Sequence, residues 1–219
     1  MTDVIDRAKK SLGTSSDAVY ALTARLIGEC HRGRGTLLDV GCGAGRLWPF
    51  VQTQFETYIG ADVLRYDGFP ASADFHTINL DTGNVPLADG SADVVAGLET
   101  IEHLENPRAY VRELVRLCKP GGWVVVTTPN QLSLLSKLSL VLLNEFSWFR
   151  GGNYPAHITA LVEIDLRRIA AECKLENAKV DYSRHGRIPG VSVKWPGFLS
   201  GLIPQALSDN VGIIAQKPA

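Results

Sequence analysis

The chain has 219 residues, of which 45% are hydrophobic and 21% charged, and its formal net charge is −1. This composition is typical of an ordinary globular protein, and the chain shows no repeat or linker, so we expect a single domain over residues 1–219. The near-neutral charge gives no basic field for DNA or RNA, which argues against a nucleic-acid partner and favours a small-molecule one. No obligate protein partner is indicated.

The cysteines and the first residues bear on the compartment. The four cysteines contain no C-x-x-C pair, which argues against a structural zinc site and against a disulfide framework. The opening residues, MTDVIDRAKK, lack the apolar core of a secretory signal, and no stretch has the unbroken apolar length that spans a bilayer. We therefore expect a cytoplasmic protein.

Helical and strand patterns alternate along the chain. An N-terminal segment, residues 1–35, is expected to form helices over 3–12 and 17–31. Later helices are expected at 107–118, after the capping residue Asn106, and at 161–173. Strands are expected at residues 37–40, 57–61, 75–80, 91–98, 120–130, 179–182 and 210–216. This alternation predicts an α/β fold with a doubly wound, three-layer sheet.

The stretch LLDVGCGAGRL, residues 37–47, is the most informative part of the chain. Gly41, Gly43 and Gly45 let the backbone turn sharply after a strand and approach a ligand where a Cβ would collide. The amides of the turn, and of a helix starting at Arg46, then point at that ligand. Asp39, at the end of the strand, is better placed for a cationic amine than for a pyrophosphate.

The pattern D-V-G-C-G-x-G in this turn resembles motif I of class I S-adenosylmethionine (SAM) dependent methyltransferases. The resemblance continues through SADVVAGLETIEH, residues 91–103, and PGGWVVVTTPN, residues 120–130, and it is closest to the ubiquinone-biosynthesis-type branch (methyltransferase types 11 and 23). It implies a Rossmann-like sheet, mostly parallel with an antiparallel last strand. It also implies SAM as cofactor and S-adenosylhomocysteine (SAH) as product.

The resemblance assigns roles to several residues. Asp62 would take both ribose hydroxyls, and Asp81 would lie beside the adenine amino group. The residues expected to contact the cofactor are Asp39, Gly41, Cys42, Gly43, Gly45, Asp62, Val63, Leu80, Asp81 and Glu99. Asp89 and Asp93 are interpreted as solvated loop residues.

Two histidines are candidate catalytic residues. His103 follows the fourth strand, where the transferred methyl group should lie, and imidazole titrates in the range that suits a general base. His157, in PAHIT before an expected cap at Thr159, is the second candidate. The other histidines, His31, His76 and His185, are interpreted as incidental. No two histidines have metal-ligand spacing on one helix, so we expect no metal.

Two long apolar segments, residues 131–155 and 187–207, are expected to determine the methyl acceptor. Polar residues recur near helical spacing within 132–149, which predicts an amphipathic helix there. The two segments form a cap, line a lipophilic acceptor pocket, or make a peripheral contact with a membrane surface. We therefore expect methyl transfer to a small, apolar or lipid-linked acceptor, at oxygen.

Two alternatives remain open at this stage. One is a catalytically silent protein of the same fold that binds SAM or a partner. The other is a nicotinamide-dependent oxidoreductase, which the GCGAG spacing and Arg46 at the third-glycine position of the dinucleotide fingerprint disfavour.

Overall fold

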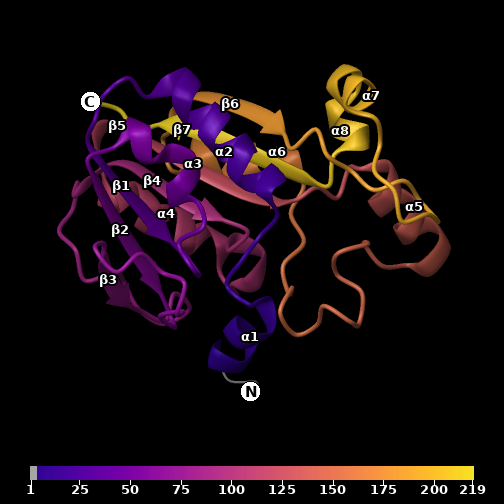
Figure 1. Cartoon of the computed structure of the whole chain (residues 1–219), viewed down its shortest axis with the longest axis horizontal. Helices are drawn as coiled ribbons and strands as arrows, with labels where there is room; N and C mark the ends of the chain where they lie inside the picture. The colour runs from indigo at the N-terminus through magenta and orange to yellow at the C-terminus, as the bar shows by residue number, and fades with distance from the viewer. Residues whose placement is uncertain (1–3) are drawn as a thin grey trace.

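The computed structural model describes residues 4–219 and is organised around a seven-stranded sheet (Figure 1). The strands are β1 (Thr36–Val40), β2 (Thr57–Asp62), β3 (Asp74–Thr77), β4 (Ala92–Leu98), β5 (Cys118–Pro129), β6 (Glu176–Tyr182) and β7 (Asn210–Gln216). They lie in the order β3-β2-β1-β4-β5-β7-β6. Strands β1 to β5 pair in parallel, whereas β7 is antiparallel to both β5 and β6. The predicted, mostly parallel sheet with an antiparallel last strand is confirmed.

Helices cover both faces of the sheet. Successive residues of a strand point to opposite faces, so Leu37 packs in the core under α2 (Asp17–Cys30) while Leu38 packs in the core under α4 (Pro107–Leu117). The short helix α3 (Trp48–Val51) shares the face of α2, and α6 (Glu163–Glu172) shares the face of α4. The result is the predicted three-layer arrangement of the Rossmann-like class.

The remaining helices are short. They are α1 (Val4–Ser11), α5 (Leu134–Leu143), α7 (Gly197–Leu202), α8 (Pro204–Leu207) and the single 3-10 turns η1 (Gln52–Gln54) and η2 (Ile101–His103). Figure 1 shows α5, α7 and α8 at one end of the molecule, so the two apolar segments of the sequence come to the same end. No helix within residues 4–219 is both long and apolar enough to cross a membrane.

Capping chemistry predicted the start of α4 correctly. The Asn106 side chain accepts a hydrogen bond from the Ala109 amide at 2.9 Å, and Pro107 occupies the first helical turn, where its missing amide is not needed. Two other helices start later in the structure than the sequence predicted. The helix after the glycine turn starts at Trp48 and not at Arg46, and α6 starts at Glu163.

Two sequence predictions about polar residues need correction, and one is confirmed. Thr159 does not cap a helix, because its hydroxyl donates to the carbonyl of Leu104 at 2.8 Å, four residues before α6 begins. Asp93 is not a solvated loop residue: it lies in β4 and accepts from the Lys119 ammonium and the Thr36 amide, both at 2.8 Å. Asp89 does lie in an exposed loop, where it pairs with Arg116 at 2.6 Å.

The helix α5 is shorter than the predicted 132–149, and its polar side faces inward. It ends at Asn144, which adopts the left-handed conformation. Ser136 and Ser139 are buried, whereas Val141 and Leu142 are 77% and 74% exposed. The buried hydroxyls have local partners, since Ser136 donates to the Gln131 side chain and Ser139 to the carbonyl of Glu145. The amphipathic pattern was therefore real, but it leaves the apolar face on the outside.

Candidate functional site

A cavity of about 590 Å³ opens at the edge of the sheet where β1, β2 and β4 end. Its volume lies in the range of small-molecule sites. Most of the predicted site residues line it: Asp39, Gly41, Cys42, Gly43, Asp62, Val63, Leu80, Asp81, Glu99, His103 and His157. Gly45 is not among the lining residues; a Cβ there would lie 2.6 Å from Pro70 and 3.1 Å from Phe69, so its place in the turn is explained by packing.

The chain turns sharply after β1 because three glycines adopt positive φ angles, +83° at Gly41, +51° at Gly43 and +69° at Gly45. A Cβ at Gly41 would lie 2.1 Å from the Thr100 hydroxyl, and one at Gly43 would lie 2.1 Å from the carbonyl oxygen of Gly13. The requirement for glycine thus comes from close approach of other parts of the protein. The Gly43 amide is held by the Asp62 carboxylate at 2.8 Å.

Asp39 is fully buried beside the cavity. One of its oxygens accepts a hydrogen bond from the Tyr58 hydroxyl at 2.9 Å, and the other has no partner among the described residues. Burial raises the pKa of this carboxyl to about 7, although the Tyr58 hydrogen bond opposes the shift. A cationic group in the cavity would restore the charged form, so the residue fits the amine that SAM carries.

Asp62 stands at the end of β2 and organises the turn. Its two oxygens accept from the amides of Gly43 and Val63 at 2.8 and 2.6 Å. Each carboxylate oxygen has a second lone pair, so both ribose hydroxyls can still be accommodated. Asp81 lies in the loop after β3, because β3 ends at Thr77 and not at the predicted residue 80, and its carboxylate accepts from the Glu105 amide at 3.0 Å.

Two buried carboxyl groups meet where β4 ends. Glu99, at φ +49°, accepts from the Asn210 side chain at 2.7 Å, and Glu102 accepts from the Thr128 hydroxyl at 3.2 Å. The second oxygen of each is buried without a partner among residues 4–219. Burial raises the pKa of both, to about 8 for Glu102. Sequence reasoning named Glu99 but overlooked Glu102, although it adjoins the candidate His103.

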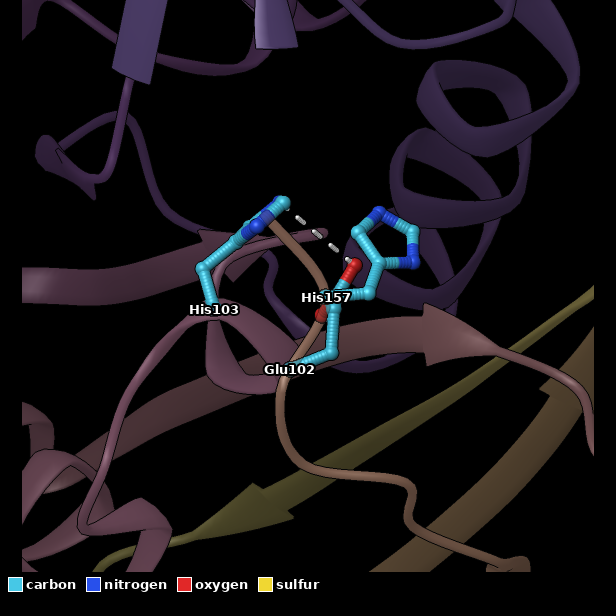
Figure 2. Close-up of side chains that lie close together, drawn as sticks. All are labelled: Glu102, His103 and His157. Carbon is cyan, nitrogen blue, oxygen red and sulfur yellow. Dashed lines mark ion pairs between the residues drawn. The ribbon is translucent and has the colours of Figure 1, made fainter. Parts of the chain in front are cut away.

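The fold brings His103 and His157 together, with ring centroids 4.8 Å apart (Figure 2). The carbonyl of Glu102 accepts from the amides of Ile158 and Thr159, both at 3.0 Å, which fixes the segment that carries His157. His103 Nδ1 lies 2.7 Å from the carbonyl oxygen of Ala156. A carbonyl only accepts, so Nδ1 carries the proton and Nε2 is the basic nitrogen.

The surroundings of these two rings differ. Nε2 of His103 lies 4.0 Å from a carboxyl oxygen of Glu102 (Figure 2). His157 is more enclosed: burial, and then the nearby His103, lower its pKa to about 4, and its Nδ1 is buried without a hydrogen-bond partner among the described residues. His157 therefore stays neutral at physiological pH.

The same three residues could also hold a metal ion. Ligand atoms of Glu102, His103 and His157 all lie within 4.8 Å of one another. The expectation of no metal rested on histidine spacing within one helix, and that argument did not allow for a loop placing His157 against η2. The absence of a metal remains a prediction.

Beyond β5 the cavity wall is basic. The sequence analysis expected the segment 187–207 to determine the acceptor but singled out none of its basic residues. It interpreted His185 as incidental, yet His185 lines the cavity. Arg187, Lys194, Asp209 and Asn210 line it as well. The sequence did contain a signal for this basic wall, because Arg187 and Lys194 are the only charged residues in the apolar segment 187–207.

The sheet order, and a cavity where β1, β2 and β4 end, are those of the class that the glycine turn resembles, the class I SAM-dependent methyltransferases. A family model described as a methyltransferase domain matches residues 16–180. The chain therefore belongs to the SAM-dependent methyltransferase family, and its cofactor is SAM.

Relatives of described function match only part of the chain. A probable SAM-dependent methyltransferase of Mycolicibacterium smegmatis is 33% identical over 107 residues, which are 47% of this chain and 42% of that protein. A ubiquinone biosynthesis O-methyltransferase of Cereibacter sphaeroides is 34% identical over 107 residues, 43% of this chain and 41% of its own length. The chain thus matches less than half of either relative.

Solved structures match the whole fold. A SAM-dependent methyltransferase from Archaeoglobus fulgidus superposes with a TM-score of 0.66 and 18% identity, over 98% of this chain and 100% of its own. SpnF, described as a [4+2]-cyclase, superposes with a TM-score of 0.58 and 18% identity, over 91% of this chain and 82% of its own. At these identities the likeness concerns the fold alone.

Proposed function

We propose that this methyltransferase transfers the methyl group of SAM to a hydroxyl oxygen of a small, partly apolar acceptor, with His103 as general base. The observation that carries the proposal is the hydrogen bond from His103 Nδ1 to Ala156, which leaves Nε2 as the basic nitrogen beside Glu102 in the cavity wall. The O-methyltransferase named among the partial relatives supports oxygen as the target. A norajmaline N-methyltransferase, 28% identical over 102 residues, is the reason to test nitrogen acceptors too.

In this proposal some residues bind the cofactor and another accepts a proton. Bound SAM supplies a methyl group that its sulfonium already activates. Asp39 and Glu99 offer buried carboxyls to the cationic part of the cofactor, and Asp62 offers its remaining lone pairs to the ribose. Nε2 of His103 would accept the proton that the acceptor hydroxyl loses on taking the methyl group. Alignment of the two reactants accounts for most of the rate in such a displacement.

We propose that the acceptor has an apolar part, and that this part binds to the exposed face of α5 and to α7. Leu138, Val141 and Leu142 on α5, and Phe198 and Leu202 on α7, all have substantially exposed side chains. Each methylene of an acceptor buried against such a surface adds at most about 0.8 kcal/mol. An acceptor series of increasing alkyl length should therefore bind progressively more tightly. Equal affinity across the series would show that the two segments only form a cap.

His103→Ala tests the catalytic assignment. We expect kcat to fall by about a hundredfold, because general-base assistance of that order is lost in the transition state, while SAH affinity stays close to the wild-type value. His157→Ala should reduce kcat much less, because its neutral, poorly basic ring is not the proton acceptor. Methyl transfer from labelled SAM and calorimetry with SAH provide the two readouts. A matching loss of SAH affinity in His103→Ala would assign this residue to cofactor positioning.

A catalytically silent SAM-binding protein is the alternative, and the cyclase SpnF shows that this fold occurs in proteins described by another activity. SAH binding without methyl transfer to any acceptor would favour it.

Treatment with a chelator tests whether the cluster of Glu102, His103 and His157 holds a metal ion or provides only a general base. We expect full activity after EDTA, and a loss that Mg²⁺ or Zn²⁺ restores would assign Glu102, His103 and His157 to a metal site instead.

A further inference from the structure

The cavity has an acidic half and a basic half. Carboxyl groups line it where β1, β2 and β4 end, at Asp39, Asp62 and Glu99. Cationic side chains line it beyond β5, at Arg187 and Lys194, in the segment between β6 and β7. The sheet order separates the two groups, because β5 and β7 lie between β4 and β6. The acidic half suits the cationic cofactor, so the basic half faces the space that remains for the acceptor.

Arg187 is the most constrained residue of the basic half. Its Nε donates to Asp209 at 2.9 Å, and its backbone amide donates to the other oxygen of the same carboxylate at 3.2 Å. The guanidinium carbon lies 4.1 Å from the centre of the Trp148 ring. An antiparallel bridge to Lys194 anchors its backbone in a short hairpin. The side chain is thus positioned by both apolar segments.

One nitrogen of this guanidinium is unused. Nη2 of Arg187 is buried and has no hydrogen-bond partner among the side chains and backbone that the structure describes. The side chain as a whole is 41% exposed and lines the cavity, so a ligand oxygen there can pair with this unused donor. Trp148 also contacts His157, which in turn contacts His103, so a line of side chains connects Arg187 with the proposed base.

We propose that Arg187 binds a carboxylate of the methyl acceptor and so selects acceptors that carry a hydroxyl at one end and a single negative charge at the other. The inference rests on the proposed function. Asp209 already balances one positive charge, and Lys194 supplies one more, which matches a monoanion. The planar guanidinium is suited to a carboxylate, and its fixed position on Trp148 lowers the entropy cost of binding.

Calorimetry on the full chain saturated with SAH tests the proposal with two probes of nearly equal shape. 4-Hydroxybenzoate carries the carboxylate, whereas 4-hydroxybenzamide replaces it with a neutral amide. We expect the benzoate to bind more tightly than the benzamide. In Arg187→Gln the benzoate affinity should fall by about ten- to a hundredfold, the usual effect of losing a hydrogen bond to a charged group, and the benzamide affinity should change little.

Arg184→Gln is the matched control, since Arg184 is an exposed arginine in the same connection, paired with Asp181 and absent from the cavity lining. It should bind both probes like the wild type. Equal affinity of the wild type for the two probes, or a benzoate affinity that Arg187→Gln leaves unchanged, would overturn the proposal. Preferred binding of phenylphosphonate over the benzoate would also overturn it, in favour of a phosphate-bearing acceptor. Failure of the protein to bind SAH at all would instead contradict the proposed function, so the two failures are distinguishable.

Discussion

Asp39 couples cofactor binding to pH. Its carboxyl has a pKa of about 7 because it is buried, and its unpartnered oxygen lies at the cavity where a cationic amine would bind. Binding of the amine favours the ionised carboxylate and therefore lowers its pKa in the complex. Below about pH 7 the carboxyl must release its proton for the complex to form. SAH affinity should then fall as the pH falls, by up to about tenfold per pH unit.

Calorimetry with SAH between about pH 5 and pH 8 measures this slope, and Asp39→Asn provides the comparison. The variant should bind more weakly at pH 8 and should lose most of the pH dependence. The pKa of Asp62 is also raised by burial, so a small residual slope is expected. An unchanged slope in Asp39→Asn would show that another group controls the linkage.

At the scale of elements, the N-terminal segment closes over the glycine turn. The Ala44 amide donates to the carbonyl of Gly13 at 2.8 Å, and the Tyr66 hydroxyl donates to the carbonyl of Ala8 at 2.7 Å. Ala8, Gly13 and the residues that follow line the cavity. The segment before α2 therefore lines the same cavity as the proposed cofactor residues, although the sequence predicted only that helices would precede β1.

Gly43→Ala tests this contact. The new Cβ would lie 2.1 Å from the carbonyl oxygen of Gly13, so the N-terminal segment must move away from the turn. We expect SAH affinity to fall by about tenfold or more, together with about 1 to 2 kcal/mol of stability for a non-glycine residue in the left-handed region. Gly121→Ala is the matched control, because Gly121 also has a positive φ, +76°, but no atom lies within 4 Å of its Cβ position. Similar SAH affinity in the two variants would contradict the argument.

The parts of the site that the sequence predicted belong to single strands and their ends. Asp39 and Asp62 lie at the carboxyl ends of the apolar strands β1 and β2, so the strand pattern places both. Strand β7 was predicted residue for residue, because a run of buried apolar residues defines it. The pairing of His103 with His157, and of Arg187 with Trp148, depends on how loops cross the sheet edge. No local pattern encodes such a crossing.

The orientation of α5 was unpredictable for a related reason. Hydrophobic periodicity shows which residues share a face, but it does not show which face is covered. Ser136 and Ser139 are buried because Gln131 and the carbonyl of Glu145 satisfy their hydroxyls. These partners lie outside the helix, in the turns at its two ends, so a pattern within the helix could not reveal them.

At the scale of the whole molecule, the antiparallel β7 unites the two halves of the cavity. Asn210 pairs with Pro129 at the end of β5, and its side chain donates to Glu99 at 2.7 Å. The segment that returns from β6 is thereby brought to the edge where the parallel strands end, and it carries Arg187 and Asp209 with it. One strand reversal therefore places the proposed acceptor residues at the same cavity as the proposed cofactor residues.

The buried acids of this site make the stability of the whole protein depend on pH. Asp39 and Glu102 have folded-state pKa values of about 7 and 8, above the ordinary values of 3.8 and 4.5. Their stabilising contribution is complete below the ordinary values and is lost as the pH rises through 7 and 8, because the unfolded chain ionises first. His157 acts in the opposite direction, since its pKa is lowered from 6.5 to about 4 and its contribution is lost as the pH falls through that interval.

Because these two acids, with Glu99 and Asp62, whose pKa values burial also raises, outweigh the histidine, the free protein should lose stability between about pH 5 and pH 8. The loss should be a few kcal/mol in total, at about 1.4 kcal/mol per group and pH unit. Urea midpoints measured across this range, with an unchanged m-value, provide the check. The double variant Asp39→Asn and Glu102→Gln keeps both sites neutral and should reduce the loss of stability, whereas Glu99 and Asp62, whose pKa values burial also raises, should leave a residual loss. Saturating SAH should flatten the wild-type profile in part, because its amine allows Asp39 to ionise. A wild-type stability that increases from pH 5 to pH 8 would show that these carboxyl groups are ionised in the folded protein, and the cofactor linkage predicted for Asp39 would then fail with it.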